Sequence, residues 1–537
     1  FLSGCASALQ STAKIDLASA QMAPSPTPYP KGMVAAAEPR AVDAGVEALR
    51  NGGTAIDAAI AVQAVLSLTE PQSSGVGGGA FLIYYDAKSG KVTAYHGREK
   101  APAAASEDLF LDANGKPLGY MTKVTSGRST GAPGAIAMLH MAHSDHGKLA
   151  WGEGFARAEK LAEDGFVISP RLAYFIKRIE PFALKKDKEA GPYFYHADGT
   201  PKQAGEVLKN PKYAQAMRHI GADYRNLYEG PIAQAFVDAV HRDPLPGALT
   251  LTDMAGYTPI KSEALCSPYR AFVLCSAWPP SSGGVAIQSI MGQLENFDMA
   301  AMGPSLEGWH TFAEASALAY ADRDEFVGDP AYVDVPIREM LAPDYLAARA
   351  ALIRPDSAIK NVVAGDPVGF KPGKDATPDE KGTSHFSIVD QFGNVVSMTT
   401  TVESVFGSQR MAHGFILNNQ LTDFSAMPRD EAGNLIANRP GGGKRPRSSM
   451  GPHIVFGEDG QFDFATGSPG GSSIIAYVAK TIVAMIVWGM SPAEAASLAS
   501  NPVSTASGNP FGAKISSIPC SISSGAWDRV SFSQTTS

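Results

Sequence analysis

The chain has 537 residues, 44% of them hydrophobic and 18% charged, an ordinary globular composition with enough apolar material for a large core. Its formal net charge of −8 does not favour binding to nucleic acid. The four cysteines show no Cys-x-x-Cys spacing and the histidines do not cluster, so we expect no metal site.

The first residues resemble a processing motif. Residues 2–5 (LSGC) are similar to the lipobox of bacterial lipoproteins, in which the cysteine is lipidated. Residues 6–32 are rich in Ser, Ala and Pro, as flexible tethers are. We therefore expect residues 1–32 to be a lipoprotein-like N-terminus and tether. This predicts a periplasmic protein, with Cys5 as a lipid anchor to the membrane.

Helices and a glycine-rich turn are predicted next. The stretch 38–68 has helical character, with Thr54 as the N-cap of its second helix. Residues 73–80 (SSGVGGGA) nearly fit a dinucleotide-binding loop, but the preceding strand and the following acidic residue that such a loop needs are not convincing. We interpret this run as a turn whose backbone closely approaches another segment. Strand-like segments follow at 81–86 and 92–97.

Residues 130–350 are mostly helical in pattern, apart from a strand that runs into a Pro/Gly loop at 268–284. Cys266 and Cys275 flank a short segment there, and two strands of a hairpin would place them opposite each other. A disulfide between them needs an oxidising compartment. The alternative is two small buried apolar side chains, and the sequence leaves both open.

The character of the chain changes after residues 355–382, which are polar and which we expect to be exposed. The apolar stretch 473–488 is too short for a membrane span and contains Lys480, so a buried helix is favoured. Residues 444–447 (KRPR) are the most basic spot of the chain and are typical of a solvated loop. Strand-like segments in this half lie at 385–390, 394–402, 452–457 and 461–467.

The junction between Gly382 and Thr383 has a specific chemical use. If this bond is cut, Thr383 gains a free α-amine beside its own hydroxyl. An α-amine with a pKa near 7.7–8 can act as the general base that activates the hydroxyl at neutral pH. Gly382 also allows the backbone geometry that an N-to-O acyl shift needs. A Gly-Thr pair alone is more often an ordinary loop-to-strand junction. The rest of the sequence must therefore decide between a cleavage site and an ordinary junction.

Seven motifs, in order along the chain, resemble those of the γ-glutamyltransferase family of N-terminal nucleophile hydrolases. They are EPQSSGVGGGAF (70–81), GREKAP (97–102), WPPSSGG (278–284), TSH (383–385), LNNQLTDFS (417–425), KRPRSSMGP (444–452) and GSPGGS (467–472). The resemblance covers residues 28–490 and stops after about Ala499. Seven ordered motifs make chance similarity implausible.

The resemblance implies an α+β fold, the four-layer αββα sandwich, in which two sheets pack face to face with helices outside. It also implies a proenzyme that cuts itself into two subunits sharing one core. Residues 33–382 would form the large subunit and residues 383–499 the catalytic small subunit. Residues 500–537 are a Ser-rich tail without family resemblance.

The resemblance also assigns residues to the two charged groups of a γ-glutamyl substrate. Arg98 would clamp the α-carboxylate with two parallel N–H bonds, and the hydroxyls of Ser448 and Ser449 would donate to the same group. Asp423 and Gln420 would accept hydrogen bonds from the α-ammonium. Hydrogen bonds to a charged group contribute roughly 1.5–3 kcal/mol each, which is enough to fix the substrate in place.

The catalytic groups follow from the same resemblance. Thr383 would be the nucleophile, and the Thr401 hydroxyl would hydrogen-bond it. The backbone N–H groups of Gly470 and Gly471 would form the oxyanion hole. Glu403 stands where many family members have Asn. Its negative charge would tighten binding of an α-amino group or shift the preference to another acyl donor.

The expected reaction is acyl transfer through a covalent intermediate, with glutathione as the default donor and no cofactor. The acceptor would be water or the amine of an amino acid or peptide. Residues 425–443 resemble a lid without a gating Tyr, so hydrolysis is expected to compete well with transfer. One alternative is an acylase for side-chain amides such as glutaryl-cephalosporins. The alternative from another class is an uncut lipoprotein without catalytic activity.

Overall fold

The computed structural model describes residues 19–24, 32–369, 371–377, 382–498 and 520–523. Cys5 lies outside these residues, as does most of the N-terminal tether and of the Ser-rich tail. Over the described part of the chain, no helix is long and apolar enough to span a bilayer. The apolar stretch near the end is helix α16 (Ser473–Ile486), which is largely buried, as the sequence predicts.

The first sheet has six strands in the order β1-β9-β10-β2-β3-β6, and every neighbouring pair is antiparallel. Every residue of β2, β9 and β10 is buried, because other layers cover both faces of the sheet. β9 and β10 follow Thr383 in the sequence yet lie between β1 and β2, so both sides of the predicted cut share this sheet. The bounds are β1 Met33–Ala36, β2 Gly79–Tyr85, β3 Val92–Gly97, β6 Ile260–Glu263, β9 Ser384–Val389 and β10 Val395–Thr401.

The second sheet has five strands in the order β15-β14-β13-β8-β7, again antiparallel. Cys266 and Cys275 are directly opposite each other in the β7–β8 hairpin and are joined by a disulfide. β15 comes from the Ser-rich tail and pairs along β14, so it occupies that edge of the sheet. The bounds are β7 Leu265–Tyr269, β8 Phe272–Ser276, β13 His453–Phe456, β14 Phe462–Gly467 and β15 Cys520–Ser523.

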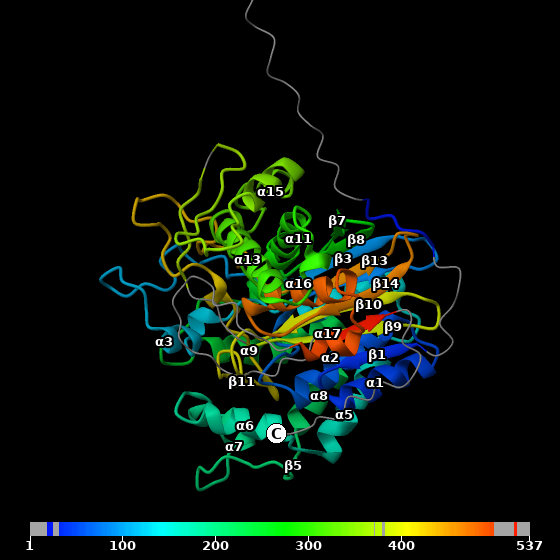
Figure 1. The fold of residues 1–537 in the computed structure, drawn as a ribbon. Coiled ribbons are helices and arrows are strands. Elements are labelled where there is room, and N and C mark those ends of the chain that lie inside the picture. The colour runs from blue at the N-terminus through cyan, green and yellow to red at the C-terminus, as the bar shows by residue number, and fades with distance from the viewer. Residues whose placement is uncertain (1–18, 25–31, 370, 378–381, 499–519, 524–537) are drawn as a thin grey trace, which may run out of the picture.

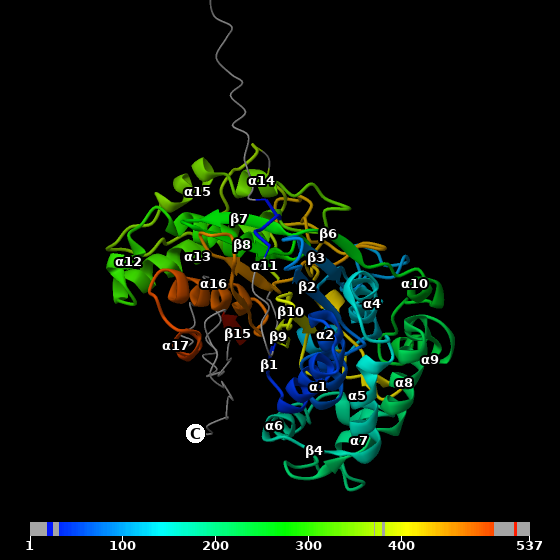
Figure 2. The ribbon, with the colours of Figure 1, turned by 90° about the vertical axis from the view of Figure 1, so that its right-hand side faces the viewer.

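The two sheets face each other, and helices cover both outer faces (Figures 1 and 2). Buried side chains of β2 and β13 meet between the sheets, where the Tyr85 and Phe456 rings lie 5.0 Å apart. Helices α1 (Pro39–Arg50), α2 (Ala55–Thr69) and α4 (Ala135–His146) lie on the outer face of the first sheet. Helices α11 (Ser282–Leu294) and α16 lie on that of the second, and α13 (Leu306–Phe326) packs against α11. The predicted four-layer αββα sandwich is confirmed.

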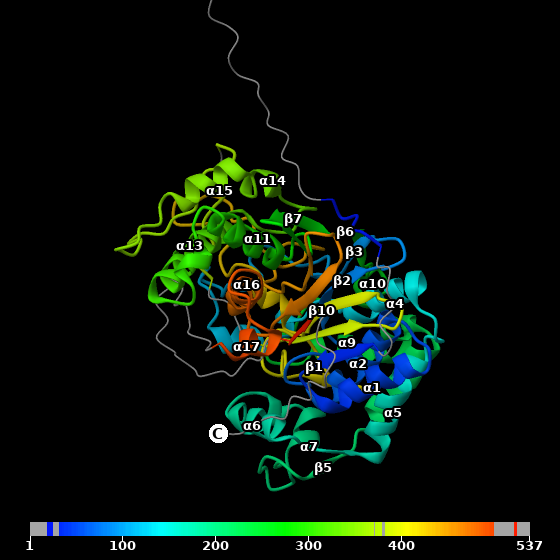
Figure 3. The ribbon, with the colours of Figure 1, turned by 45° about the vertical axis from the view of Figure 1, so that its right-hand side comes forward.

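The remaining elements are peripheral. A helical lobe packs beside α1 and α2, with α6, α7 and β5 at its far end (Figure 3). Its elements are α5 Glu153–Asp164, β4 Phe166–Val167, α6 Pro170–Arg178, α7 Ala190–Phe194, β5 Val207–Leu208, α8 Pro211–Ala222 and α9 Gly230–Val240. The others are α3 Tyr120–Val124, α10 Leu251–Ala255, α12 Met299–Met302, α14 Ile337–Met340, α15 Pro343–Ala350, β11 Met411–Ala412, β12 Phe415–Ile416 and α17 Pro492–Ser497.

Candidate active site

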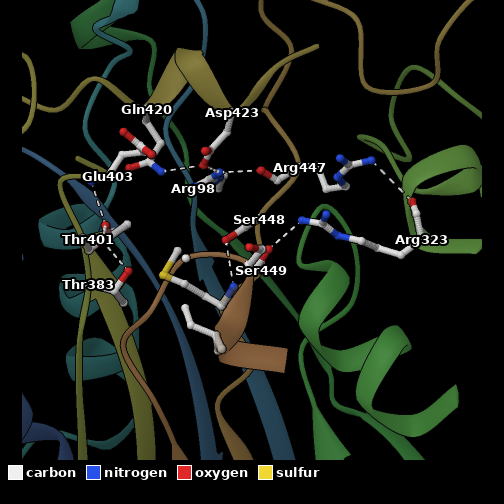
Figure 4. A pocket seen from close by; sticks show the side chains of 15 residues that line it. Arg98, Arg323, Thr383, Thr401, Glu403, Gln420, Asp423, Arg447, Ser448 and Ser449 are labelled. Carbon is white, nitrogen blue, oxygen red and sulfur yellow. Dashed lines mark hydrogen bonds and ion pairs between the residues drawn. The ribbon is translucent and has the colours of Figure 1, made fainter. Parts of the chain in front are cut away.

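A pocket of about 350 Å³ lies where the ends of β9 and β10 meet the segment around Ser448 and the start of α16 (Figure 4). The predicted residues that line it are Arg98, Gly382, Thr383, Thr401, Glu403, Gln420, Asp423, Ser448, Ser449 and Gly471. Gly470 is not among the described lining residues, whereas two unpredicted arginines, Arg323 and Arg447, are.

The Gly382 carbonyl oxygen is the centre of the polar contacts at the predicted nucleophile. The Thr383 hydroxyl donates to this oxygen, and the Thr401 hydroxyl also donates to it, at 2.5 Å. The oxygen of Thr401 in turn accepts the Glu403 backbone N–H at 2.7 Å. The Thr401 oxygen acts as the acceptor toward this N–H. Its single hydroxyl proton is therefore donated to the Gly382 carbonyl oxygen. The predicted scissile carbonyl is thus held by two hydroxyl groups.

The register of two strands brings these threonines together. Thr383 directly precedes β9 and Thr401 ends β10, and their neighbours Ser384 and Thr400 are paired in the antiparallel ladder. The glycine-rich turn packs at the same place, where a Cβ on Gly78 would lie 2.0 Å from the Thr401 carbonyl oxygen. This is the close backbone approach predicted for that turn, and it excludes any side chain.

Arg98 lies at another end of the pocket and is completely buried. Its Nε donates to the Pro446 carbonyl at 3.0 Å, while Nη2 donates to the Arg447 carbonyl at 2.6 Å and to the Asp423 carboxylate. Nη1 makes no hydrogen bond to any described residue and lies 3.7 Å from the Glu99 carboxylate. The two-pronged clamp predicted from the sequence therefore requires Asp423 to release Nη2.

Glu99 lies behind Arg98 and is also completely buried. Within the described part of the chain, neither of its carboxylate oxygens has a hydrogen-bond partner. Burial raises the pKa of Glu99 to about 8, although the Arg98 guanidinium opposes the shift. At neutral pH this carboxyl is therefore mostly protonated and does not neutralise Arg98, whose charged partner is Asp423.

The two predicted serines each accept a hydrogen bond from a fixed N–H group. The Ser448 oxygen accepts the Met450 backbone N–H at 3.2 Å, and the Ser449 oxygen accepts Arg323 Nη2 at 2.6 Å. The Pro/Ser/Gly loop holds this segment, because the backbone N–H and the hydroxyl of Ser282 donate to the Ser448 carbonyl at 2.7 and 2.6 Å. Both serines therefore lie on a stretch of backbone that a distant motif fixes.

The side of the pocket predicted to bind an ammonium group is lined by acceptors. Gln420 Nε2 donates to Asp423 at 2.8 Å, while Gln420 Oε1 is buried without a hydrogen-bond partner among the described residues. The Glu403 carboxylate accepts from the Asn419 side chain and from the Thr422 hydroxyl, the latter at 3.4 Å. Two carboxylates and an amide oxygen are therefore gathered within one short arc of the pocket wall.

A family model described as gamma-glutamyltranspeptidase matches residues 41–502. The chain belongs to the γ-glutamyltranspeptidase family. This confirms the resemblance on which the sequence analysis rests.

Two relatives named glutathione hydrolase proenzyme are similar over most of the chain. The protein from Bacillus subtilis (strain 168) is 37% identical over 473 residues, which cover 86% of this chain and 78% of the relative. The protein from Escherichia coli (strain K12) is 36% identical over 478 residues, which cover 87% and 80%. Among solved structures, a cephalosporin acylase from Bacillus halodurans matches with a TM-score of 0.75 at 25% identity, covering 87% of this chain and 82% of that one.

In this γ-glutamyltranspeptidase-family chain, the glycine pair stands at the start of α16. Gly470 and Gly471 have φ of +135° and +58°, a backbone region that favours glycine. They precede Ser472, the N-cap residue of the helix, where backbone N–H groups and the helix dipole favour negative charge. Gly471 lines the pocket directly, and the Tyr320 hydroxyl holds the loop by donating to the Ser472 carbonyl.

The basic spot that we interpreted as a solvated loop is buried, and that interpretation was wrong. Lys444, Arg445 and Arg447 are only 2%, 6% and 4% exposed. Arg447 forms an ion pair with Asp375 at 3.1 Å, and the Lys444 ammonium donates to two backbone carbonyls. Burial lowers the pKa of Lys444 to about 8. The partners of these cations are distant in sequence or belong to the backbone, so local composition does not reveal them.

Two arginines of the pocket were not predicted from the sequence, and only one of them lies in a recognised motif. Arg447 directly precedes Ser448 within one of the seven motifs. Arg323 stands on α13, outside all of them.

Among the described residues, no group of three or more His, Cys, Asp or Glu side chains is placed to hold a metal ion. His385, next to the nucleophile motif, bonds to the hydroxyls of Thr399 and Ser387 at 2.9 and 3.0 Å. Burial lowers its pKa to about 3, so the imidazole is neutral at physiological pH. This environment gives His385 a structural role.

Proposed function

We propose that the chain is a self-cleaving γ-glutamyl hydrolase and acyltransferase that acts on γ-glutamyl amides such as glutathione. One observation carries this proposal: the Gly382 carbonyl accepts hydrogen bonds from both Thr383 and Thr401 inside a pocket with oppositely charged walls. The names of the two relatives, glutathione hydrolase proenzyme, support both the substrate class and the processing.

Self-cleavage follows from the contacts of the uncut chain. The Thr383 oxygen attacks the Gly382 carbonyl carbon, and the Thr401 hydroxyl stabilises the oxyanion that forms on the Gly382 oxygen. The C–N bond then breaks, its nitrogen takes the proton from the hydroxyl, and an ester links Gly382 to Thr383. Water hydrolyses this ester, which releases the Gly382 carboxylate and the Thr383 hydroxyl, beside the α-amine that the previous step freed.

Turnover uses the same threonine. The new α-amine takes the proton of the Thr383 hydroxyl, whose oxygen attacks the γ-carbonyl of the substrate. We assign stabilisation of the tetrahedral oxyanion to the Gly470 and Gly471 N–H groups at the start of α16. The leaving amine takes the proton, and water or an acceptor amine then attacks the acyl-enzyme ester.

The charged walls match the two ends of a γ-glutamyl group. Arg98, Ser448 and Ser449 are assigned to the α-carboxylate, since each offers N–H or O–H donors there. Asp423, Gln420 and Glu403 are assigned to the α-ammonium, because they supply acceptors and negative charge. A γ-glutamyl group carries both charges, and a glutaryl group carries only the carboxylate.

The acylase alternative has less support. The cephalosporin acylase shares the fold at 25% identity, whereas both glutathione hydrolase proenzymes are more than 35% identical to the chain. A glutaryl donor also has no ammonium group for Asp423, Gln420 and Glu403 to bind. Comparing γ-glutamyl and glutaryl p-nitroanilides decides between the two, and we expect a clear preference for the γ-glutamyl donor.

We further propose the division and location expected from the sequence. Residues 33–382 and 383–499 are assigned to the large and small subunits, and residues 500–537 to a tail. The periplasmic location stays a prediction; a disulfide between Cys266 and Cys275 needs an oxidising compartment, and the periplasm is one such compartment. Lipidation at Cys5 stays a prediction from the LSGC motif.

A denaturing gel with N-terminal sequencing tests the proposed function. The purified protein should give two fragments, the smaller beginning at Thr383-Ser384-His385-Phe386, instead of a single band at 56.3 kDa. Thr383→Ala should abolish both cutting and release of p-nitroaniline from the γ-glutamyl donor. Thr383→Ser, which keeps a hydroxyl, is the matched control and should still cut. An intact chain that hydrolyses γ-glutamyl amides would contradict the assignment, and an intact inactive chain would favour the uncut lipoprotein.

A further inference from the structure

Ser449 receives a hydrogen bond from a residue outside the seven motifs. Arg323, in the last turn of α13, is 2% exposed and places Nη2 at 2.6 Å from the Ser449 oxygen (Figure 4). The two residues are 126 positions apart and lie on opposite sides of the predicted cut. This contact therefore joins the two assigned subunits at the carboxylate end of the pocket.

The chemistry of the two groups fixes the direction of this hydrogen bond. A guanidinium has only N–H donors, so the Ser449 oxygen must act as the acceptor. The Ser449 hydroxyl donates to no other described residue, and Ser449 lines the pocket. Its single proton therefore cannot point toward Arg323 and is left for a ligand in the pocket.

Arg323 is itself held rigidly. Its Nε donates to the Ser282 hydroxyl oxygen at 3.0 Å, and its Nη1 donates to Asp324 at 2.7 Å. One turn earlier on α13, Tyr320 donates to the Ser472 carbonyl, beside the glycine pair. One turn of α13 thus contacts the carboxylate end of the pocket and the loop assigned to the oxyanion.

We propose that Arg323 is a positioning residue that acts through Ser449. It orients the hydroxyl proton of Ser449 toward the α-carboxylate of a γ-glutamyl donor before the donor binds. Such preorientation lowers the cost of ordering the group on binding. The inference rests on the proposed function, because it concerns the same donor pocket.

The first experiment replaces Arg323 by Lys and compares two donors. γ-Glutamyl p-nitroanilide carries the carboxylate, and 4-aminobutyryl p-nitroanilide lacks only that group. We expect Arg323→Lys to raise KM for the first by about 10-fold with kcat nearly unchanged, on the scale of one hydrogen bond to a charged group. KM for the second donor should not change, and an equal rise for both donors would overturn the proposal.

Arg349→Lys is a matched control, because Arg349 is also buried and its Nη2 donates to the Leu318 carbonyl of the same helix α13, at 3.2 Å. It should change neither KM. The second experiment is a double-mutant cycle with Ser449→Ala. In that background Arg323→Lys should have almost no further effect, whereas a full second 10-fold loss would show that Arg323 does not act through Ser449.

Calorimetric titration with L-glutamate measures the same contact without turnover. Arg323→Lys should weaken binding of L-glutamate about 10-fold, on the scale of one hydrogen bond to a charged group, and should leave binding of 4-aminobutyrate unchanged. If Arg323→Lys weakens L-glutamate binding as expected but the wild type hydrolyses neither anilide, only the proposed function is contradicted. Equal affinity of wild type and variant for L-glutamate would overturn the role of Arg323.

If Arg323→Lys does not fold, Ser282→Ala decides when it is measured alone and in the Ser449→Ala background, because it removes the acceptor of Arg323 Nε together with one of two donors on the Ser448 carbonyl, and only the first effect should disappear without the Ser449 hydroxyl. It should raise KM for the γ-glutamyl donor alone. Equal effects on both donors would count against the proposal.

Discussion

At the scale of single residues, the site is organised by the direction of hydroxyl protons. Thr401 and Ser448 each accept a backbone N–H, and Ser449 accepts a guanidinium N–H. An oxygen that accepts a fixed N–H has its own proton left to donate elsewhere. For Thr401 the recipient is visible, since it is the Gly382 carbonyl oxygen.

Thr401→Val tests the hydrogen bond from the Thr401 hydroxyl to the Gly382 carbonyl at the predicted cleavage site. Valine keeps the shape of the side chain and removes the donor on the Gly382 oxygen, so self-cleavage should slow by about 10²–10³-fold. A time course of the uncut band on a denaturing gel measures the rate. Thr400→Val is the matched control, because among the described residues the neighbouring hydroxyl has a hydrogen bond only to the Gly79 carbonyl, at 3.4 Å. Similar cleavage rates for both variants would contradict the role of Thr401.

Glu403→Gln tests the assignment of Glu403 to the α-ammonium of the donor. Glutamine keeps the size of the side chain and removes its negative charge, so KM for γ-glutamyl p-nitroanilide should rise by about 10-fold, the scale of one charge-assisted hydrogen bond. The glutaryl donor has no ammonium group and serves as the internal control, with KM unchanged. Steady-state kinetics with both donors checks this, and a loss shared by the two would mean that Glu403 acts on structure instead.

At the scale of elements, paired strands carry the site to one place. The β9–β10 ladder brings Thr383 to Thr401, and the β7–β8 hairpin leads into the Pro/Ser/Gly loop that holds Ser448. β8 also pairs with β13, and the Ser276 hydroxyl donates to the Pro452 carbonyl at 2.8 Å. The stability of this hairpin therefore supports the carboxylate end of the pocket.

Removing the hairpin disulfide should weaken this support. The loop that it closes is short, with a sequence separation of 9, so its loss should lower the free energy of unfolding by about 2–3 kcal/mol. The double variant Cys266→Ala/Cys275→Ala should unfold at a lower urea concentration than wild type. Wild type with its disulfide reduced is the control and should unfold at the same concentration as the variant. Equal midpoints for the oxidised wild type and the variant would contradict this prediction.

At the scale of the whole molecule, the two assigned subunits form one body. Strands from both sides of the predicted cut share the first sheet, and the second sheet combines β7 and β8 with β13, β14 and β15. Burial on this scale also encloses carboxyl groups far from the site. Glu70, at the end of α2, is 2% exposed, and burial raises its pKa from 4.5 to about 7, aided by nearby Glu38 and opposed by Arg171.

This shift predicts how stability depends on pH. A carboxyl with a raised folded-state pKa binds its proton more tightly in the folded state. Its stabilising contribution is therefore complete below pH 4.5 and is lost as the pH rises through about 7. Glu70→Gln should be more stable than wild type at pH 8 by up to about 3 kcal/mol, and the difference should vanish near pH 4.5.

Urea midpoints measured from pH 4.5 to 8 test this dependence. Glu47→Gln on the exposed side of α1 is the control and should not alter the pH profile. A constant difference between Glu70→Gln and wild type across this range would contradict the prediction.

The sequence by itself determined the family and, through the family resemblance, the layered fold and the class of enzyme. Ordered motifs predicted Thr383, Arg98, Asp423 and the two serines as site residues, and all five line one pocket. Strand patterns after the junction also predicted β9, β10, β13 and β14. These features are local or are carried by short motifs, so they can be seen in the linear chain.

Only the tertiary structure decided how these groups are engaged. It placed Arg323 against Ser449, occupied two of the Arg98 nitrogens with protein groups, buried Arg447 and left Gly470 outside the pocket lining. The physical reason is that each of these outcomes depends on contacts between segments separated by long stretches of chain. The Arg98–Asp423 pair, for example, spans 325 positions. Neither periodicity nor local composition records which buried charges meet across such distances.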